Sequence, residues 1–282
     1  MTPGLEATLV ERGWIAVDLP DPRPVLDARG RLLARLREGP LPGLSDLDAY
    51  HTRVDDDNRH VGILHGLATF YWEGDFGRAI ISANLDLFRR LVGLDLHVQR
   101  YPYLRVVRPG QPHDAAPLHR DTYYGASPYE ASVLVPFTDM GAEDAVRVIS
   151  GSHVVADTDY PYVQHVSPDV AMGSPKHRLG FPYAPRLLDP AHAERAEPVP
   201  LRVGQALIFG LSLVHGHGIS QSRRTRVSSD IRVVNSLAPF RMSRGVRDDY
   251  YAPLCSSPVS LSARLYLAAN EDTMETTLRA DP

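Results

Sequence analysis

Two residues that can bind a metal, His119 and Asp121, lie two positions apart in the segment PLHRDTYYG. In a β-strand, side chains at positions i and i+2 point to the same face, so the imidazole and the carboxylate can reach one ion. A non-haem iron site of the two-histidine, one-carboxylate type needs one more histidine and leaves the remaining coordination positions open. The pair therefore predicts part of such a site, and the third ligand must come from elsewhere in the chain.

The third ligand is expected in the segment SLVHGHGIS, which holds His215 and His217. His215 ends an apolar run that reads as a strand, and the chain between Asp121 and His215 is long enough to hold several strands. His217 points to the same face of an extended chain and is therefore a rival ligand. If His215 is the ligand, His217 is expected beside the cosubstrate or the substrate.

The segment that follows, TRVSSDIRVV, alternates between apolar and polar residues. Arg226 and Ser228 share the polar face with Asp230 and Arg232. A guanidinium can donate two parallel hydrogen bonds to a carboxylate, and a neighbouring hydroxyl can add a third. These two residues therefore predict a carboxylate clamp. The dicarboxylate 2-oxoglutarate, which chelates iron through its 2-oxo acid end, would be held at both ends.

The motifs PLHRDTYYGASPYE, VISGSH and LVHGHGISQSRRTRVSSDIR resemble the Fe(II)/2-oxoglutarate-dependent oxygenases of the phytanoyl-CoA dioxygenase-like branch. They are similar to members from bacterial sugar and aminoglycoside antibiotic clusters, and the resemblance covers roughly 100–235. It implies a double-stranded β-helix fold and the cofactors Fe(II), 2-oxoglutarate and O₂. It also implies roles for five residues: iron binding by His119, Asp121 and His215, and cosubstrate binding by Arg226 and Ser228.

Spacing within the resemblance favours His215 over His217. In this branch the arginine of the clamp follows the distal histidine by eleven positions, as Arg226 follows His215. Ser220 stands where the family often has Asn, and Leu134 stands near a position where it often has Trp. The carboxylate of Asp121 is absent from some halogenases of the superfamily, so its presence here favours hydroxylation or another oxidative outcome.

Five further residues are candidates for cofactor or substrate contacts. Arg105 can help to bind a carboxylate, or it can be a surface residue. Arg232 can line the site, or it can form a salt bridge with Asp230 or a neighbour. Tyr123, Tyr124 and Glu130 follow the first motif, so they are candidate substrate contacts, although strand tyrosines often serve packing alone.

The elements that must position these residues are helical at first and then mainly β. Apolar periodicity predicts helices at 24–39 and 75–93, with Asp75 as a cap, and a closing helix at 257–270 capped by Ser257. Strand-forming runs are expected at 99–110, 130–140, 145–153, 204–216 and 225–240. Without intervening helices, these runs predict an antiparallel sandwich or barrel, in keeping with the jelly-roll, cupin-like fold that the resemblance implies.

We expect one domain over 1–282. Residues 1–97 would form a largely helical support, and 98–240 a β-helix core interrupted by a long loop at about 154–203. Residues 241–282 would form a C-terminal helical segment. The role of the loop and the oligomeric state are not predicted.

Composition narrows the setting in which the protein acts. The formal net charge of −4 and the lack of a long basic run argue against nucleic acid as a partner. The chain has one cysteine, no signal-peptide pattern and no apolar run long enough to span a bilayer. A cytoplasmic protein that does not engage a membrane is therefore expected.

The expected function is oxidative decarboxylation of 2-oxoglutarate coupled to C–H oxidation of a small polar natural-product intermediate. The outcome stays open among hydroxylation, desaturation, epimerisation and ring closure. The alternative is a non-redox, metal-dependent isomerase or epimerase on the same cupin-like fold.

Overall fold

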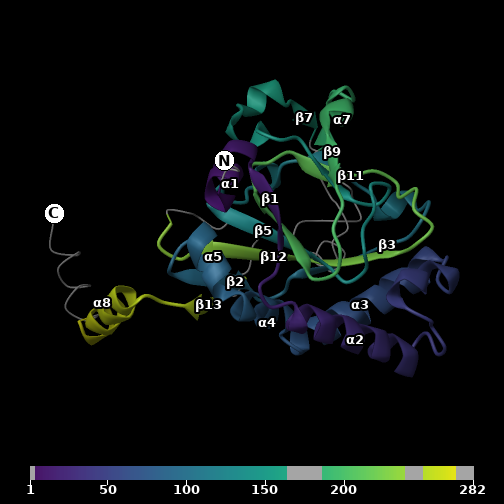
Figure 1. Cartoon of the computed structure of the whole chain (residues 1–282), viewed down its shortest axis with the longest axis horizontal. Coiled ribbons are helices and arrows are strands. Elements are labelled where there is room, and N and C mark those ends of the chain that lie inside the picture. Colours follow the sequence, from purple (N-terminus) through teal and green to yellow (C-terminus); the bar gives the residue numbers. More distant parts are fainter. Residues whose placement is uncertain (1–3, 164–185, 239–249, 271–282) are drawn as a thin grey trace, which may run out of the picture.

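The computed structural model describes residues 4–163, 186–238 and 250–270. These residues form a sandwich of two antiparallel sheets with helices covering one face (Figure 1). In the described part of the chain, the sheets do not close into one continuous barrel. The prediction of a mainly β, jelly-roll fold with helical support is confirmed.

The larger sheet has seven strands in the order β1-β10-β5-β12-β2-β13, with β3 also paired to β12. Their bounds are β1 Trp14–Asp18, β2 Leu96–Gln99, β3 Tyr103–Val107, β5 Glu130–Pro136, β10 Gln205–Gly210, β12 Arg226–Asn235 and β13 Tyr251–Cys255. The ten-residue strand β12 lies at the centre, with β5 along one edge and β3 followed by β2 along the other. The clamp residues are therefore on the most enclosed strand of the sheet.

The smaller sheet has the order β4-β11-β6-β9. Its strands are β4 Ala116–His119, β6 Val146–Val148, β9 Glu197–Val199 and β11 His215–His217, and a separate hairpin pairs β7 Tyr162–Val163 with β8 Arg186–Leu187. An apolar cluster that includes Leu134 and Phe209 of the large sheet and Val148 of the small sheet fills the interior between the two sheets. The histidine-bearing strands β4 and β11 are therefore fixed against the inner face of the large sheet.

Helices cover the outer face of the large sheet (Figure 1). The α-helices are α1 Leu5–Arg12, α2 Arg23–Glu38, α3 Asp57–Glu73, α4 Phe76–Ala83, α5 Leu85–Leu91, α7 His192–Arg195 and α8 Pro258–Ala269. Short 3₁₀ helices are η1 Leu47–Thr52, η2 Pro112–Asp114, η3 Asp121–Tyr124, η4 Ser152–Val154 and η5 Asp157–Asp159. On α2, Leu32, Leu33 and Leu36 are buried in the core under the sheet.

Two predictions for the N-terminal region are wrong in detail. The predicted helix at 75–93 is two helices, because the chain breaks at Asn84. The Asn84 side chain accepts from the amide of Asp21 and donates to the carbonyls of Asp21 and Ile80. Asp75 has φ 50° and makes no side-chain cap. The strand β1 was not expected, and it pairs with β10, far along the chain.

The run predicted as one strand at 204–216 is two strands, β10 in the large sheet and β11, which His215 begins, in the small sheet. The strand β13 was not expected in the C-terminal segment. The closing helix is α8, where Ser257 caps the amide of Ser260. The irregular stretch at about 154–203 holds β9, which pairs with β6 and was not predicted. Residues 164–185, part of the predicted loop, lie outside the described residues.

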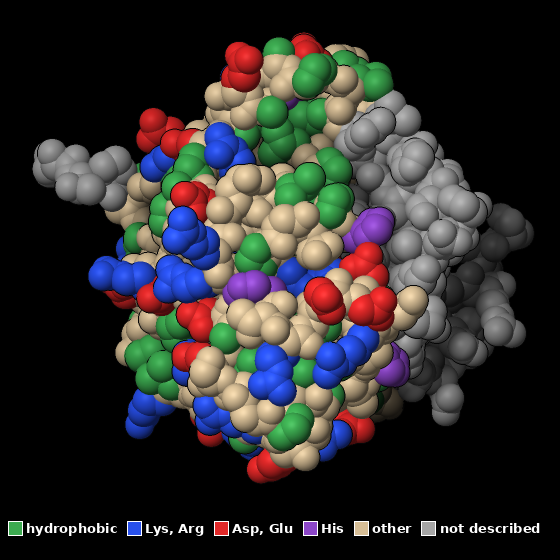
Figure 2. Space-filling model, turned by 90° about the vertical axis from the view of Figure 1, so that its right-hand side faces the viewer, with side chains coloured by type: hydrophobic (Ala, Val, Ile, Leu, Met, Phe, Trp, Pro, Cys, Tyr) green, Lys and Arg blue, Asp and Glu red, His purple; other side chains and the backbone are tan. Residues whose placement is uncertain are grey.

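No helix in the described part of the chain is long and apolar enough to cross a bilayer. On the face drawn in Figure 2, acidic and basic side chains are interspersed over the described residues. They form no continuous basic field there of the kind that nucleic-acid binding requires.

Candidate metal centre

His119 and His215 are brought together by the pairing of β4 with β11. His119 is the last residue of β4 and His215 the first of β11, and the two are direct partners in the ladder. Their ring centroids are 4.6 Å apart. Because both histidines sit on paired strands, the backbone hydrogen bonds of the sheet fix their separation.

Asp121 completes the group from just beyond the end of β4. The expectation that His119 and Asp121 share one strand is wrong in detail, because Asp121 begins η3. The intervening Arg120 is extended, with φ −111° and ψ 142°, and the Asp121 amide donates to the Leu211 carbonyl at 3.0 Å. The carboxylate therefore still lies beside the imidazole, held by a loop contact instead of a ladder.

The donor atoms of the three side chains converge. Nε2 of His119 is 3.5 Å from Oδ1 of Asp121, and Nε2 of His215 is 3.8 Å from Oδ2. One ligand atom from each of the three residues lies within 4.8 Å of the other two. Two imidazoles and one carboxylate on one side of an ion form the donor set of a non-haem Fe(II) site.

The protonation of the ligands suits metal binding. Nδ1 of His119 donates to the Pro117 carbonyl at 2.6 Å, and Nδ1 of His215 donates to the Leu213 carbonyl at 3.0 Å. With Nδ1 as the donor, Nε2 is the nitrogen of each neutral ring that can bind a metal. Burial lowers the pKa of His215 to about 4, so its ring is neutral at neutral pH.

His217 lies outside this group. Among the described residues, the structure gives His119, Asp121 and His215 as the cluster that could hold a metal. His217 is opposite Ala116 in the ladder. Burial, followed by the charges of Arg226 and Arg105, lowers the pKa of His217. His217 therefore lies near Arg226 of the predicted clamp, and its place beside the cosubstrate stays a prediction.

Gly216, between the two histidines, is required by a close backbone approach that the sequence analysis missed. A Cβ atom here would lie 2.7 Å from the carbonyl oxygens of Ala116 and Pro117. Any larger residue would push β11 away from β4 and separate the ligands. The HGH pattern was the available signal.

Arg226 and Ser228 lie on the inner face of β12 and are both fully buried. Nη1 of Arg226 donates to the Asp144 carbonyl at 2.6 Å. Within the described residues, Nε and Nη2 of Arg226 and Oγ of Ser228 have no hydrogen-bond partner. Burial lowers the pKa of Arg226 to about 10, although the guanidinium stays charged at neutral pH. A buried cation with unused donors is costly unless an anion binds it.

Two other predicted arginines are paired with aspartates. Arg105 forms an ion pair with Asp230. Nη2 of Arg232 lies 2.6 Å from Oδ2 of Asp121. Of the two alternatives for Arg232, a place in the site or a salt bridge with Asp230 or a neighbour, the structure shows a salt bridge to Asp121 of the candidate metal centre. Burial raises the pKa of the Asp121 carboxyl, but Arg232, His215 and His119 together outweigh burial, and that pKa lies well below its usual range.

The predicted substrate contacts Tyr123 and Glu130 are engaged inside the protein. The ring of Tyr123 stacks on that of Tyr162, with the ring centroids 3.7 Å apart. The Tyr123 hydroxyl donates to the Tyr160 carbonyl at 2.9 Å. Glu130 accepts from the amide of Ser127 at 2.9 Å and from the hydroxyl of Tyr251. The side chain of Tyr124 lies outside what the structure describes. Substrate contact by these three residues stays a prediction.

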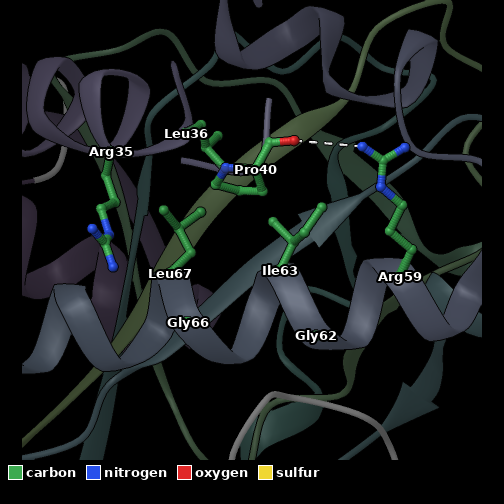
Figure 3. A pocket seen from close by; sticks show the side chains of 8 residues that line it. All are labelled: Arg35, Leu36, Pro40, Arg59, Gly62, Ile63, Gly66 and Leu67. Carbon is green, nitrogen blue, oxygen red and sulfur yellow. Dashed lines mark hydrogen bonds between the residues drawn. The ribbon is translucent and has the colours of Figure 1, made fainter. Parts of the chain in front are cut away.

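A separate hollow lies between α2 and α3 (Figure 3). Its volume is about 490 Å³, and Leu36, Ile63 and Leu67 line it together with Arg35 and Arg59. The Arg59 guanidinium donates to the Pro40 carbonyl across it. None of these residues belongs to the metal centre, so this hollow is distinct from the candidate site.

The chain therefore combines a cupin-like fold with a cluster of three residues that could hold a metal ion. The profile of the phytanoyl-CoA dioxygenase (PhyH) family matches residues 46–228, and the chain belongs to this family. A search of curated proteins finds no significant match.

Two solved structures illustrate the likeness of fold. The apo form of the non-heme monooxygenase ThoJ is 19% identical with a TM-score of 0.58, over 90% of this chain and 84% of that chain. The α-ketoglutarate-dependent carbocyclase SnoK from nogalamycin biosynthesis is 15% identical with a TM-score of 0.51, over 89% and 96% of the two chains. At these identities the likeness shows the fold alone.

Proposed function

We propose that this protein is an Fe(II)/2-oxoglutarate-dependent oxygenase that oxidises a C–H bond of a small polar natural-product intermediate. Two observations support the proposal that the protein binds a metal: its membership in the PhyH family and the donor set of His119, Asp121 and His215. The use of 2-oxoglutarate is inferred from the buried pair Arg226 and Ser228. Their donor atoms have no partner among the described residues and match the acceptors of one carboxylate.

Each residue then has a role in binding or orientation. His119, Asp121 and His215 would hold Fe(II) and leave its remaining coordination positions for other ligands. Arg226 and Ser228 bind the far carboxylate of 2-oxoglutarate, next to the buried His217. When bound, iron and 2-oxoglutarate supply with O₂ the oxidising power that breaks the C–H bond. The chain supplies a dry, oriented site between the two sheets.

A non-redox, metal-dependent isomerase is the alternative. Such an enzyme would use the three metal ligands but would leave Arg226 buried without an anion. The retained carboxylate of Asp121 favours hydroxylation, desaturation, epimerisation or ring closure over halogenation. The names of ThoJ and SnoK describe a monooxygenase and a carbocyclase, so this fold does not select one outcome.

The test is an anaerobic titration of the metal-free protein with Fe(II) and then 2-oxoglutarate. The wild type should develop the weak visible charge-transfer band of the iron–2-oxoglutarate chelate, and a His119→Ala variant should not. With O₂ admitted, iron-dependent succinate should form. A folded, iron-loaded protein that develops no band and forms no succinate would exclude the oxygenase and favour the isomerase.

A further inference from the structure

We propose that Arg232, Ser132 and Asp230 form a subsite for the hydroxyl groups of a neutral, polyhydroxylated substrate beside the metal centre. The proposal rests on the proposed function, whose substrate class it names. It starts from three buried polar atoms on the inner face of the large sheet, none of which has a partner among the described residues.

Arg232 connects this subsite to the metal centre. Its Nη2 atom lies 2.6 Å from Oδ2 of Asp121, which holds the guanidinium next to the metal-binding group. The residue is 7% exposed, and its Nη1 atom has no hydrogen-bond partner in the described part of the chain. Native proteins rarely bury a free donor of a charged group, so Nη1 is expected to meet a ligand oxygen.

Ser132 lies directly opposite Arg232 in the β12–β5 ladder. Residues paired across a ladder project from the same face, so the Ser132 hydroxyl points to the same inner space. Ser132 is 1% exposed, and its Oγ has no partner among the described residues. A hydroxyl can both donate and accept, so it complements the pure donor of Arg232.

Asp230 adds an acceptor two positions before Arg232 on the same face. Its Oδ2 atom is taken by Arg105. Its Oδ1 atom is buried and, in the described residues, has no hydrogen-bond partner. The three residues together present a free donor, a free hydroxyl and a free acceptor.

This mixture selects the class of ligand. An alcohol can accept from Nη1 of Arg232 and donate to Ser132 or Asp230, so several alcohols on one molecule satisfy all three residues. A carboxylate would satisfy Arg232 but would bring negative charge beside Asp121 and Asp230. An apolar group would leave every one of these atoms unpaired.

The cosubstrate does not account for these atoms. Arg226 and Arg232 are six residues apart on one strand, or about 20 Å along its axis. Arg226 serves the predicted clamp, whereas the guanidinium of Arg232 is turned to Asp121. The Arg232 end of the strand is therefore left for the substrate.

The experiment uses the full chain loaded with Ni(II), which is redox-inert here, and 2-oxoglutarate. Saturation-transfer NMR would measure binding of glycerol, myo-inositol and methyl α-glucopyranoside, beside the matched acids glycerate and methyl α-glucopyranosiduronate. At least one neutral polyol should bind, and more tightly than the acids. Ser132→Ala should weaken that binding roughly fivefold to tenfold, as expected for one lost hydrogen bond.

Ser229→Ala is the matched control, because Ser229 is a fully buried serine on β12 whose side chain takes the opposite face. It should leave polyol binding unchanged. Tighter binding of the acids, equal effects of the two serine variants, or no polyol binding to a protein that takes up Ni(II) and 2-oxoglutarate normally would each overturn the subsite alone. Failure of the wild type to bind Ni(II) or 2-oxoglutarate would overturn the proposed function itself.

Discussion

His215 lies directly opposite His119 across the β4–β11 ladder, whereas His217 lies opposite Ala116. The two-residue difference decides which histidine joins Asp121 in the cluster that could hold a metal ion. The ladder holds His119 and His215 with their rings 4.6 Å apart. The choice between two histidines that the sequence places on the same face is therefore made by strand register.

Replacement of the two histidines should separate their roles. His215→Ala should weaken Fe(II) or Ni(II) binding more than about 100-fold, beyond the usual cost of losing an outer partner of a metal ligand. His217→Ala should change metal affinity only a few-fold. Calorimetric titration with Ni(II) checks both, and the reverse order of effects would make His217 the ligand.

Replacement of the predicted clamp residues should weaken the binding of 2-oxoglutarate and leave metal binding largely unchanged. Arg226→Met removes charge-assisted hydrogen bonds, so the Kd for 2-oxoglutarate should rise about 100-fold, while Ser228→Ala should raise it about tenfold. Metal affinity should stay within a few-fold of wild type.

The Arg226→Met variant can also be tested by its thermal stability. Because it removes a buried charge that forms no ion pair among the described residues, the metal-free protein should be at least as stable as wild type. Thermal unfolding with and without 2-oxoglutarate checks this, and the wild type alone should gain stability from the cosubstrate. A strongly destabilised variant would mean that Arg226 has a structural role.

Arg232 should act on the metal through Asp121. Loss of its contact frees the carboxylate to rotate, so Arg232→Gln should weaken Ni(II) binding about 10-fold to 100-fold. Arg105→Gln is the control, since Arg105 pairs with Asp230 and not with Asp121. If both variants bind Ni(II) equally well, Arg232 does not position the ligand.

Asn84 should contribute more to the free energy of unfolding than is usual for a side chain of its size. Its buried amide makes three hydrogen bonds where α4 ends and α5 begins. Asn84→Ala leaves the Asp21 backbone groups unpaired, so the free energy of unfolding should fall by about 2–3 kcal/mol. Asn270→Ala, at the exposed end of α8, should cost less than about 0.5 kcal/mol. Urea unfolding measures both.

His60 should make the metal-free protein acid-sensitive. Burial lowers its pKa from 6.5 to about 4. Between these values the unfolded chain binds the extra proton and the folded protein does not, so the free energy of unfolding falls as the pH falls from about 6.5 to 4. For His60 alone this loss amounts to at most about 3 kcal/mol.

In the His60→Gln variant, the free energy of unfolding should depend less steeply on pH than in the wild type. His215 is shifted in the same direction to about 4, so some of the slope should remain. Urea unfolding at several pH values between 7 and 5 measures the slope for wild type, His60→Gln and the control His65→Gln, which changes an exposed residue of the same helix. An unchanged slope in His60→Gln would contradict the assignment.

Features that depend on local spacing could be predicted from the amino-acid sequence alone. The alternation in β12 places Arg226, Ser228, Asp230 and Arg232 on one face, because neighbouring strand residues must point to opposite sides. The spacing of apolar residues at the helical period predicted α2, and the serine at the start of the last helix predicted the Ser257 cap of α8. The motifs around His119 and His215 were sufficient to predict the fold class.

Features that depend on contacts between distant segments could be seen only in the folded chain. The ladder register selected His215, and the close approach of β4 and β11 explains Gly216. The break at Asn84 and the pairing of β1 with β10 involve segments far apart in the chain, so local periodicity carries no signal for either. The salt bridge from Arg232 to Asp121 joins two residues more than a hundred positions apart, and which buried charge meets which is set by the packing of the two sheets.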